Sequence, residues 1–248
     1  MQVQTHTSGP LPVLRADAQA QTQAQAQAVP GGLRSLFGPS LRSALFVAVV
    51  TGLAYPLVTT LVAQAAFPKA ANGSLVMRQG SVVGSALIGQ EFASPRYFQG
   101  RPSATTAPDP DKADATVAAP YNAALSAATN QGSTHAALKE SVAARVAAYR
   151  ELNGLAADAA VPVDAVTASA SGLDPHISVA NAELQLPRVA RERQLPVAKV
   201  QELLRQQVEP RVLGLLGEPR VNVLQMNLAL DDLSAATLQP AAVHAAKE

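Results

Sequence analysis

The pattern of hydrophobic and polar positions contains one long apolar stretch near the N-terminus. SALFVAVVTGLAYPLVTTLVAQAAF runs from Ser43 to Phe67 without a charged residue. As a helix rising about 1.5 Å per residue, it is long enough to cross a hydrocarbon core about 30 Å thick. Pro56 would usually break a soluble helix, but a membrane helix tolerates proline where neighbouring groups satisfy the freed carbonyl. We predict a transmembrane helix over residues 41–67.

Two other readings of this stretch are a buried helix of a soluble domain and a cleaved signal peptide. Soluble helices are rarely uncharged over such a length. Ala63, Gln64 and Ala65 resemble a cleavage site, but the apolar part of a signal peptide is only about 7–15 residues long. An uncleaved signal anchor therefore fits better. The stretch also lacks the ionisable residues that mark ion paths in membranes, which indicates that this chain alone does not conduct an ion.

The charges beside the stretch are nearly balanced across it. Arg34 and Arg42 precede it, and Lys69 and Arg78 follow it. The positive-inside rule therefore gives little guidance. The position of the stretch near the N-terminus favours a cytoplasmic N-terminus and an exported C-terminal domain.

Helical periodicity recurs in the second half of the chain. The first helix is predicted over residues 133–154, with Gly154 as its stop. Its apolar positions recur at steps of four and three: Leu138, Val142, Val146, Tyr149 and Leu152. A second helix is predicted over 179–194, where Pro187 indicates a kink or a late start. A third begins at Pro196 and ends at Pro210. Its apolar face is Val200, Leu203, Leu204 and Val208.

Shorter patterns predict strands and loops around these helices. Residues 72–90 have short apolar runs between glycines, typical of strands or turns. Residues 93–114 are loop-like, with Tyr97 and Phe98 as candidate anchors to the core. The stretch VNVLQMNLAL (221–230) alternates, which predicts a half-buried strand. Its apolar positions are Leu224, Met226, Leu228 and Leu230. The sum is one soluble α+β domain over residues 68–248.

The amino-acid composition excludes several classes of function. Residues 1–40 contain AQAQTQAQAQA, a low-complexity run without apolar periodicity, and are predicted to be a disordered tail. The chain has 248 residues, a net charge of +1 and no cysteine. Thiolate catalysis and cysteine-based metal sites are thus excluded, and nucleic-acid binding is not supported without a basic cluster.

Motifs for metal and nucleotide chemistry are incomplete or missing in the sequence. The four histidines are scattered. Asp109, Asp111 and Asp114 faintly resemble a calcium loop, but they lack its glycine and terminal glutamate. We find neither a Gly-x4-Gly-Lys-Ser/Thr phosphate loop nor the Asp-Lys-Thr-Gly stretch of a phosphorylated transport ATPase. We therefore expect no metal, no tightly bound cofactor and no ATP hydrolysis by this chain alone.

The stretch VTASASGLDPHIS (166–178) contains the residue types of a nucleophilic hydrolase: Ser169, Ser171, Asp174 and His176. A nucleophile elbow needs Gly-x-Ser-x-Gly, and that spacing is not met. A turn explains the same residues more completely, because Gly172 permits a positive φ and Ser178 suits a helix N-cap. We therefore assign no catalytic residue. Further along, Arg188, Arg191 and Arg193 predict a basic helix surface that is either solvated or a docking surface for an acidic partner.

Several stretches together resemble one family, the small C subunit of the Kdp-type potassium-transporting ATPases of bacteria. They occur in the family's order and are TGLAYPLVTT (51–60), NGSL (72–75), GSALIGQEF (84–92), YFQGRPSA (97–104), VTASASGLDPHIS (166–178), RVARER (188–193) and VNVLQMNLALDDL (221–233). After Asn122 the family's Ser/Gly/Asn-rich loop is reduced here to traces such as Gly132 and Ser133.

The resemblance implies a single-pass inner-membrane protein with a cytoplasmic N-terminus and a periplasmic domain. It implies assembly with a channel-like subunit that selects potassium and a P-type subunit that hydrolyses ATP. The family's C subunit is regarded as a catalytic chaperone that raises the pump's affinity for ATP, so ATP belongs to the complex. The alternatives are a serine hydrolase and a stand-alone anchored binding module.

Two loops are candidates for contact with partners, because each combines small residues with a few fixed polar groups. The first is Gly100, Arg101, Pro102, Ser103 and Ala104. The second contains Ser169, Ser171, Gly172 and Asp174. Both loops also suit a role in the domain's own fold.

Overall fold

The structure is a computed structural model that describes residues 33–112 and 114–245. The chain divides into two compact units, residues 1–68 and 69–248. The predicted tail lies mostly in residues 1–32, outside the described residues. Residues 33–40, which were assigned to that tail, are helical instead.

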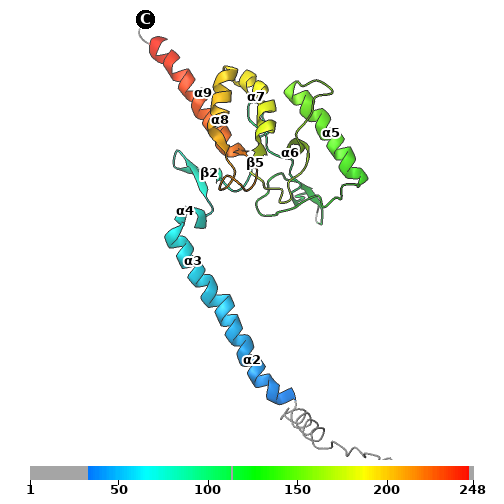
Figure 1. Ribbon diagram of the computed structural model, residues 1–248, viewed down its shortest axis with the longest axis vertical. Coiled ribbons are helices and arrows are strands. Elements are labelled where there is room, and N and C mark those ends of the chain that lie inside the picture. Colours follow the sequence, from blue (N-terminus) through cyan, green and yellow to red (C-terminus); the bar gives the residue numbers. More distant parts are fainter. Residues whose placement is uncertain (1–32, 113, 246–248) are drawn as a thin grey trace, which may run out of the picture. The chain divides into compact units, whose positions relative to one another are not determined.

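The described part of the first unit is a continuous helix over residues 33–66 with exposed apolar side chains, drawn in blue to cyan in Figure 1. It consists of α2 (Leu33–Val49), the π-helical segment η1 (Val50–Ala54) and α3 (Tyr55–Ala66). Residues 35–66 are the one helix among those described that is long and apolar enough to cross a membrane. This confirms the predicted membrane helix and places its start earlier.

Pro56 explains the π-helical segment. Proline has no N–H and its ring clashes with the carbonyl four residues earlier, so the turn before it must widen. The Tyr55 N–H donates instead to the Val50 carbonyl, five residues back. The hydroxyl of Thr59 donates to the Tyr55 carbonyl at 2.9 Å, and that of Thr51 to the Val47 carbonyl at 2.7 Å. Local bonds of this kind let the helix continue through the proline.

The second unit is an α+β fold, as predicted. After the short α4 (Pro68–Ala71), its helices are α5 (Ala136–Asn153), α6 (Val163–Val166), α7 (Val179–Arg193), α8 (Val197–Gln207) and α9 (Val223–Ala245). Its strands are β1 (Leu75–Arg78), β2 (Ser81–Ser85), β3 (Thr106–Pro108), β4 (Thr116–Ala118), β5 (His176–Ser178), β6 (Val208–Glu209) and β7 (Arg220–Asn222). All described strand pairs are antiparallel: the hairpins β1–β2 and β3–β4, and a sheet in the order β5-β7-β6.

One aliphatic core joins the sheet β5-β7-β6 to the helices. The helices α7, α8 and α9 all contact β7, and α8 contacts both α7 and α9 (Figure 1). The core residues are Phe98, Ile177, Ala182, Leu186, Val189, Ala190, Leu195, Val200, Leu204, Val221, Val223, Met226 and Leu230. Phe98 thus anchors the 93–114 loop, as predicted.

The predicted helix boundaries at the ends of α5 and α7 are confirmed. Gly154 ends α5 in the left-handed conformation with φ 64°. The Ser178 side chain caps α7 by accepting the Asn181 N–H. The helix α7 therefore starts directly after the 166–178 stretch and keeps Pro187 in its interior, so the late start is excluded.

The predicted strand over 221–230 is wrong beyond Asn222. Strand β7 ends there and α9 begins at Val223. The burial pattern is helical, because Val223, Met226 and Leu230 are all buried. The alternation that suggested a strand resulted from the buried polar residue Asn227, which breaks the apparent helical stripe.

The predicted basic surface on α7 is also wrong for two of its three arginines. Arg191 is exposed, but Arg188 and Arg193 are buried. Arg188 donates to the Tyr97 carbonyl at 3.1 Å and also to the carbonyl of Pro95. Arg193 donates to the Arg96 carbonyl at 2.7 Å. These two cations therefore fix the loop 95–97 to α7 rather than present charge to a partner.

Candidate functional site

The two candidate loops at 100–104 and 169–174 lie against each other. An Arg101 guanidinium nitrogen lies 2.9 Å from the Asp174 carboxylate. The Ser103 hydroxyl donates to the Gly172 carbonyl at 2.8 Å, and the Ser169 N–H donates to the Pro102 carbonyl at 3.2 Å. Gly100, Ala104 and Ser171 are half-buried in the same contact region. The loops therefore form one structural unit, which we call the loop junction.

Two glycines make room for close contacts in and beside the junction. A Cβ on Gly172 would lie 2.8 Å from the Ala127 carbonyl oxygen, and its φ of 69° disfavours any side chain. A Cβ on Gly100 would lie 2.2 Å from the Tyr121 hydroxyl oxygen. The predicted positive φ at Gly172 is confirmed. Glycine is required at this position both by the backbone conformation and by the lack of space for a side chain.

Tyr121 holds the junction from the side. Its hydroxyl donates to the Arg101 carbonyl at 2.6 Å. Burial, together with the negative charge of Asp174, raises the pKa of Tyr121 to about 12. The phenol therefore keeps its proton at neutral pH and remains a donor.

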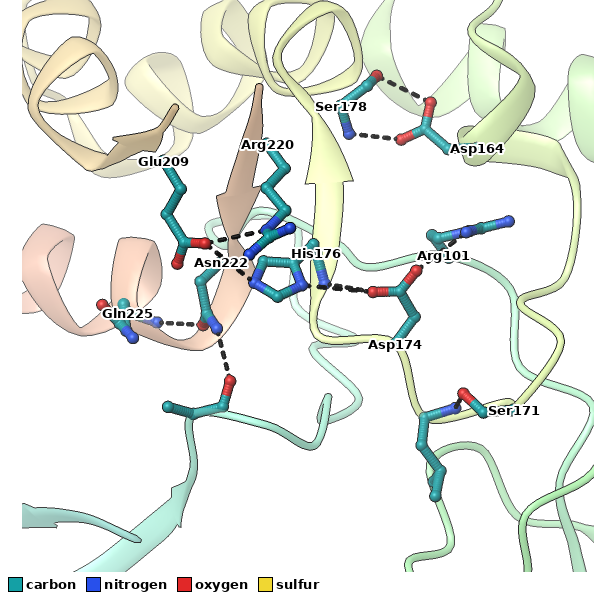
Figure 2. A network of polar contacts seen from close by, with 12 residues as sticks. Arg101, Asp164, Ser171, Asp174, His176, Ser178, Glu209, Arg220, Asn222 and Gln225 are labelled. Carbon is teal, nitrogen blue, oxygen red and sulfur yellow. Dashed lines mark hydrogen bonds and ion pairs between the residues drawn. The ribbon is translucent and has the colours of Figure 1, made fainter. Parts of the chain in front are cut away.

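A row of charges, linked through the imidazole of His176, extends from the junction into the sheet. Figure 2 shows His176 between Asp174 and Glu209, with Arg101 on the far side of Asp174 and the Arg220 guanidinium beside His176 and Glu209. The His176 Nδ1 lies 3.5 Å from Asp174 Oδ1, and its Nε2 lies 3.5 Å from Glu209 Oε2. Arg220 Nε lies 3.0 Å from Glu209 Oε2. The row connects the 100–104 loop with β5, β6 and β7.

Asp174 is the central acceptor of this row. Burial alone would raise the pKa of Asp174. Hydrogen bonds from the His176 side chain and backbone, followed by the Arg101 hydrogen bond and charge, outweigh burial and lower the pKa to about 2. Asp174 is therefore ionised at neutral pH and ties Arg101 to β5.

The serines of the 166–178 stretch are not arranged with His176 as a nucleophile and base. The Ser171 hydroxyl accepts the Leu173 N–H at 3.1 Å (Figure 2). Ser169 Oγ is buried and has no hydrogen-bond partner among the described residues. Both ring nitrogens of His176 instead face carboxylates. Within residues 33–112 and 114–245, no group of three His, Asp or Glu side chains is placed to hold a metal ion.

A cavity of about 330 Å³ lies beside the junction, between the 91–103 segment and α5. Its polar wall includes Arg101, Arg145 and Tyr149. These groups already have partners, since Arg145 donates to the Val166 carbonyl at 3.1 Å and Tyr149 donates to Asn181. Burial raises the pKa of Tyr149. The cavity is therefore lined by two cations, Arg101 and Arg145, and some of their N–H groups already donate to other groups of the domain.

Two buried amides next to the junction were not predicted from the sequence. The Asn227 side chain accepts the Phe98 N–H and donates to the Phe98 carbonyl, both at 2.9 Å. Gln185 does the same for Gln99, at 2.8 and 3.1 Å. Residues 98–99 are thus paired as in a sheet, with side chains in place of a neighbouring strand. The sequence signal that could have revealed these two amides was a polar residue on an otherwise apolar helix face.

Within the described residues, one apolar helix able to span a membrane is followed by a compact α+β unit, which is the arrangement of a single-span membrane protein with a soluble region. The family model described as K+-transporting ATPase, c chain (KdpC) matches residues 37–232. The chain therefore belongs to the KdpC family and is a membrane subunit of a potassium-transporting ATPase.

Relatives agree with this assignment. The potassium-transporting ATPase KdpC subunit of Bradyrhizobium diazoefficiens is 52% identical over 197 residues, which are 79% of this chain and 96% of the relative. The KdpC subunits of Methylobacterium nodulans and Methylorubrum extorquens are each 54% identical over 196 residues, with the same coverage. The region matched by the family model, residues 37–232, includes both loops of the junction.

Proposed function

We propose that this chain is an accessory subunit of a high-affinity, ATP-driven potassium uptake pump. It assembles with a channel-like subunit that selects potassium and a P-type subunit that hydrolyses ATP, and it has no catalytic site of its own. The observation that carries this proposal is the membrane helix, whose 43–67 stretch contains no Asp, Glu, Lys, Arg or His to guide an ion. The ion path and the phosphoryl chemistry then belong to the partner subunits.

The specific role we propose is that of a catalytic chaperone that raises the pump's affinity for ATP. The contacts around the loop junction support this role, because Asp174 ties the 100–104 loop to β5 through Arg101 and the His176 N–H. With the soluble region outside the cytoplasm, its effect on a cytoplasmic nucleotide is conformational and passes through membrane helices. ATP is bound by the complex rather than by this chain.

Purification from native membranes in mild detergent tests the assembly. We expect this chain to co-purify with one channel-like and one P-type subunit. ATP hydrolysis is then compared for the complex with and without the chain, and we expect a higher KM for ATP without it. Recovery of the wild-type chain alone, or an unchanged KM, would contradict the proposal.

The orientation we propose places the N-terminus in the cytoplasm and residues 69–248 in the periplasm of the bacterial inner membrane. The chain has no cysteine, so single cysteines report position without interference. In cells with a permeabilised outer membrane, an impermeant maleimide is expected to label Ala157→Cys, at an exposed site, and to leave Ser8→Cys unlabelled. The opposite labelling pattern would reverse the proposed orientation.

A further inference from the structure

The connection between β6 and β7 exposes large apolar side chains. Residues 210–219 read PRVLGLLGEP. Leu213 is 87% exposed and Leu215 is 79% exposed, fractions above that of Val163, another strongly exposed apolar residue of this unit at 73%. Val212 and Leu216 are also exposed. We call Val212, Leu213, Leu215 and Leu216 the apolar tip.

The apolar tip is held in a fixed shape. Val212 and Leu216 form two backbone hydrogen bonds, at 2.9 and 3.0 Å, and the Gly214 N–H donates to the Arg211 carbonyl at 3.1 Å. Leu213 has a φ of 54°, which is unfavourable for a leucine. A strained residue that also holds an apolar side chain in water points to a function outside the fold.

The base of the tip is joined to the core and to the row of charges. Pro210 and Pro219 bracket the loop and restrict its backbone. Beyond them, Glu209 pairs with Arg220 (Figure 2), and β7 contributes the buried Val221 to the core. The tip therefore moves with the domain rather than as a free loop.

Charge and composition favour a protein over a lipid as the occupant. The two arginines near the tip, Arg211 and Arg220, pair with Glu218 and Glu209, so the rim has no unpaired cation for a phosphate headgroup. Residues 210–219 contain no Trp, Tyr or Lys, the residues that favour a membrane interface. A preformed apolar centre with a neutral polar rim is the usual anatomy of a protein interface.

We infer that the apolar tip is a docking knob that inserts into an apolar pocket on another subunit of the same transporter. The inference rests on the proposed function, because it needs the larger complex to exist. It assigns the binding role to residues 212–216 rather than to the loop junction. Each buried leucine would strengthen binding by about tenfold or more.

The test uses the full chain with two substitutions that preserve the fold. Asn tolerates the left-handed conformation better than Leu, so Leu213→Asn relieves strain while it removes the apolar contact. In combination with Leu215→Ser, it is expected to leave the midpoint temperature of thermal unfolding unchanged or slightly raised. The amount of partner subunits that co-purifies with the double variant is expected to fall by about a hundredfold. Val163→Asn, at another apolar and strongly exposed position, is the matched control and should assemble normally.

The outcomes separate this inference from the proposed function. If the wild-type chain assembles and the double variant assembles equally well, the docking role is wrong and the proposed function stands. If the wild-type chain does not assemble, the proposed function itself fails.

A photoreactive group on Leu213→Cys in the assembled complex identifies the occupant. A crosslink to one of the two larger subunits, identified by mass, supports the inference. Crosslinks only to lipid, or only to a second copy of this chain, overturn it.

Discussion

At the scale of single residues, the soluble unit depends on a few groups that connect distant segments. Asp174 lies at the centre, since it binds Arg101 from the 100–104 loop and accepts the His176 N–H at 3.0 Å in β5. Gly172, two residues earlier, removes the side chain that would separate the same loops. These positions were selected from the sequence as small or polar residues in a turn, and the structure gives each a contact.

Asp174→Asn is expected to destabilise the chain in a pH-dependent way. Because the pKa of Asp174 lies at about 2 rather than 3.8, its ionised form stabilises the fold at pH values above about 4 and loses this effect as pH falls toward 2. The free energy of unfolding should fall by about 2 kcal/mol at pH 7, and by about half of that at pH 3. Urea titration of the full chain in mild detergent measures both values.

The exposed Asp158 provides the control for this experiment, since Asp158→Asn removes one carboxylate without disturbing the junction. It should change stability by less than about 0.5 kcal/mol. An Asp174→Asn effect of the same size at pH 7 and pH 3 would contradict the role given to its ionised form.

Gly172→Ala should cost more stability than Gly154→Ala, although both glycines have a left-handed φ. The backbone strain is similar, at about 1 kcal/mol. Only Gly172 lacks space, because its Cβ would lie 2.6 Å from the Thr105 side chain and 2.8 Å from the Ala127 carbonyl. We expect a total loss of about 3 kcal/mol there, measured by urea titration. Equal losses in the two variants would refute the steric explanation.

At the scale of elements, helices were easier to predict than the polar groups they bury. The helices α5 and α8 were predicted from apolar periodicity, with Gly154 and Pro196 as boundary signals, and Ser178 was predicted as the cap of α7. The first turns of α9, residues 223–230, were predicted to be a strand because periodicity cannot recognise a buried Asn227 that pairs with the Phe98 backbone. The arginines of α7 were placed in solvent for the same reason. A charged residue is usually exposed, and the acceptors on residues 95–97 become visible only after folding.

The buried arginine of α7 leads to a prediction with a control on the same helix. Arg188→Met removes the donors for the Tyr97 carbonyl, Asn153 and Gln185. Buried acceptors without donors should cost about 3 kcal/mol of unfolding free energy. Arg191→Met, at an exposed position, should change it by less than about 0.5 kcal/mol. Urea titration of both variants measures the difference, and similar losses would contradict the burial of Arg188.

At the scale of the whole molecule, the sequence predicted the membrane helix, the α+β class and the family. It could not predict which surface faces a partner. The candidate loops are half-buried in contact with each other. The sequence pattern did not predict that the apolar tip at 212–216 would be exposed. From the sequence alone, apolar residues between two prolines are expected to be buried in the core, and only the folded structure shows that they are exposed. Exposure is a property of the complete fold, so no local pattern reveals it.

Residues 69–248 are expected to fold without the membrane helix. The core residues and the hydrophobic side chains packed on them all lie between Phe92 and Leu233. The isolated region should be soluble at low concentration and unfold in one cooperative transition, followed by circular dichroism. Asp174→Asn should destabilise it by the same amount as the full chain. A gradual transition without a clear midpoint would show that the membrane helix is needed for the fold.

The widened turn at Val50–Ala54 changes how the membrane helix presents itself to its neighbours. One extra residue in a helical turn rotates everything after it by about 100° relative to a regular helix. A stripe of side chains along α2 therefore does not continue along the same side of α3. A straight neighbouring helix that follows one stripe meets a different set of side chains in each half. The span thus presents different side chains along one side before and after residues 50–54, a change that follows from the single proline at position 56.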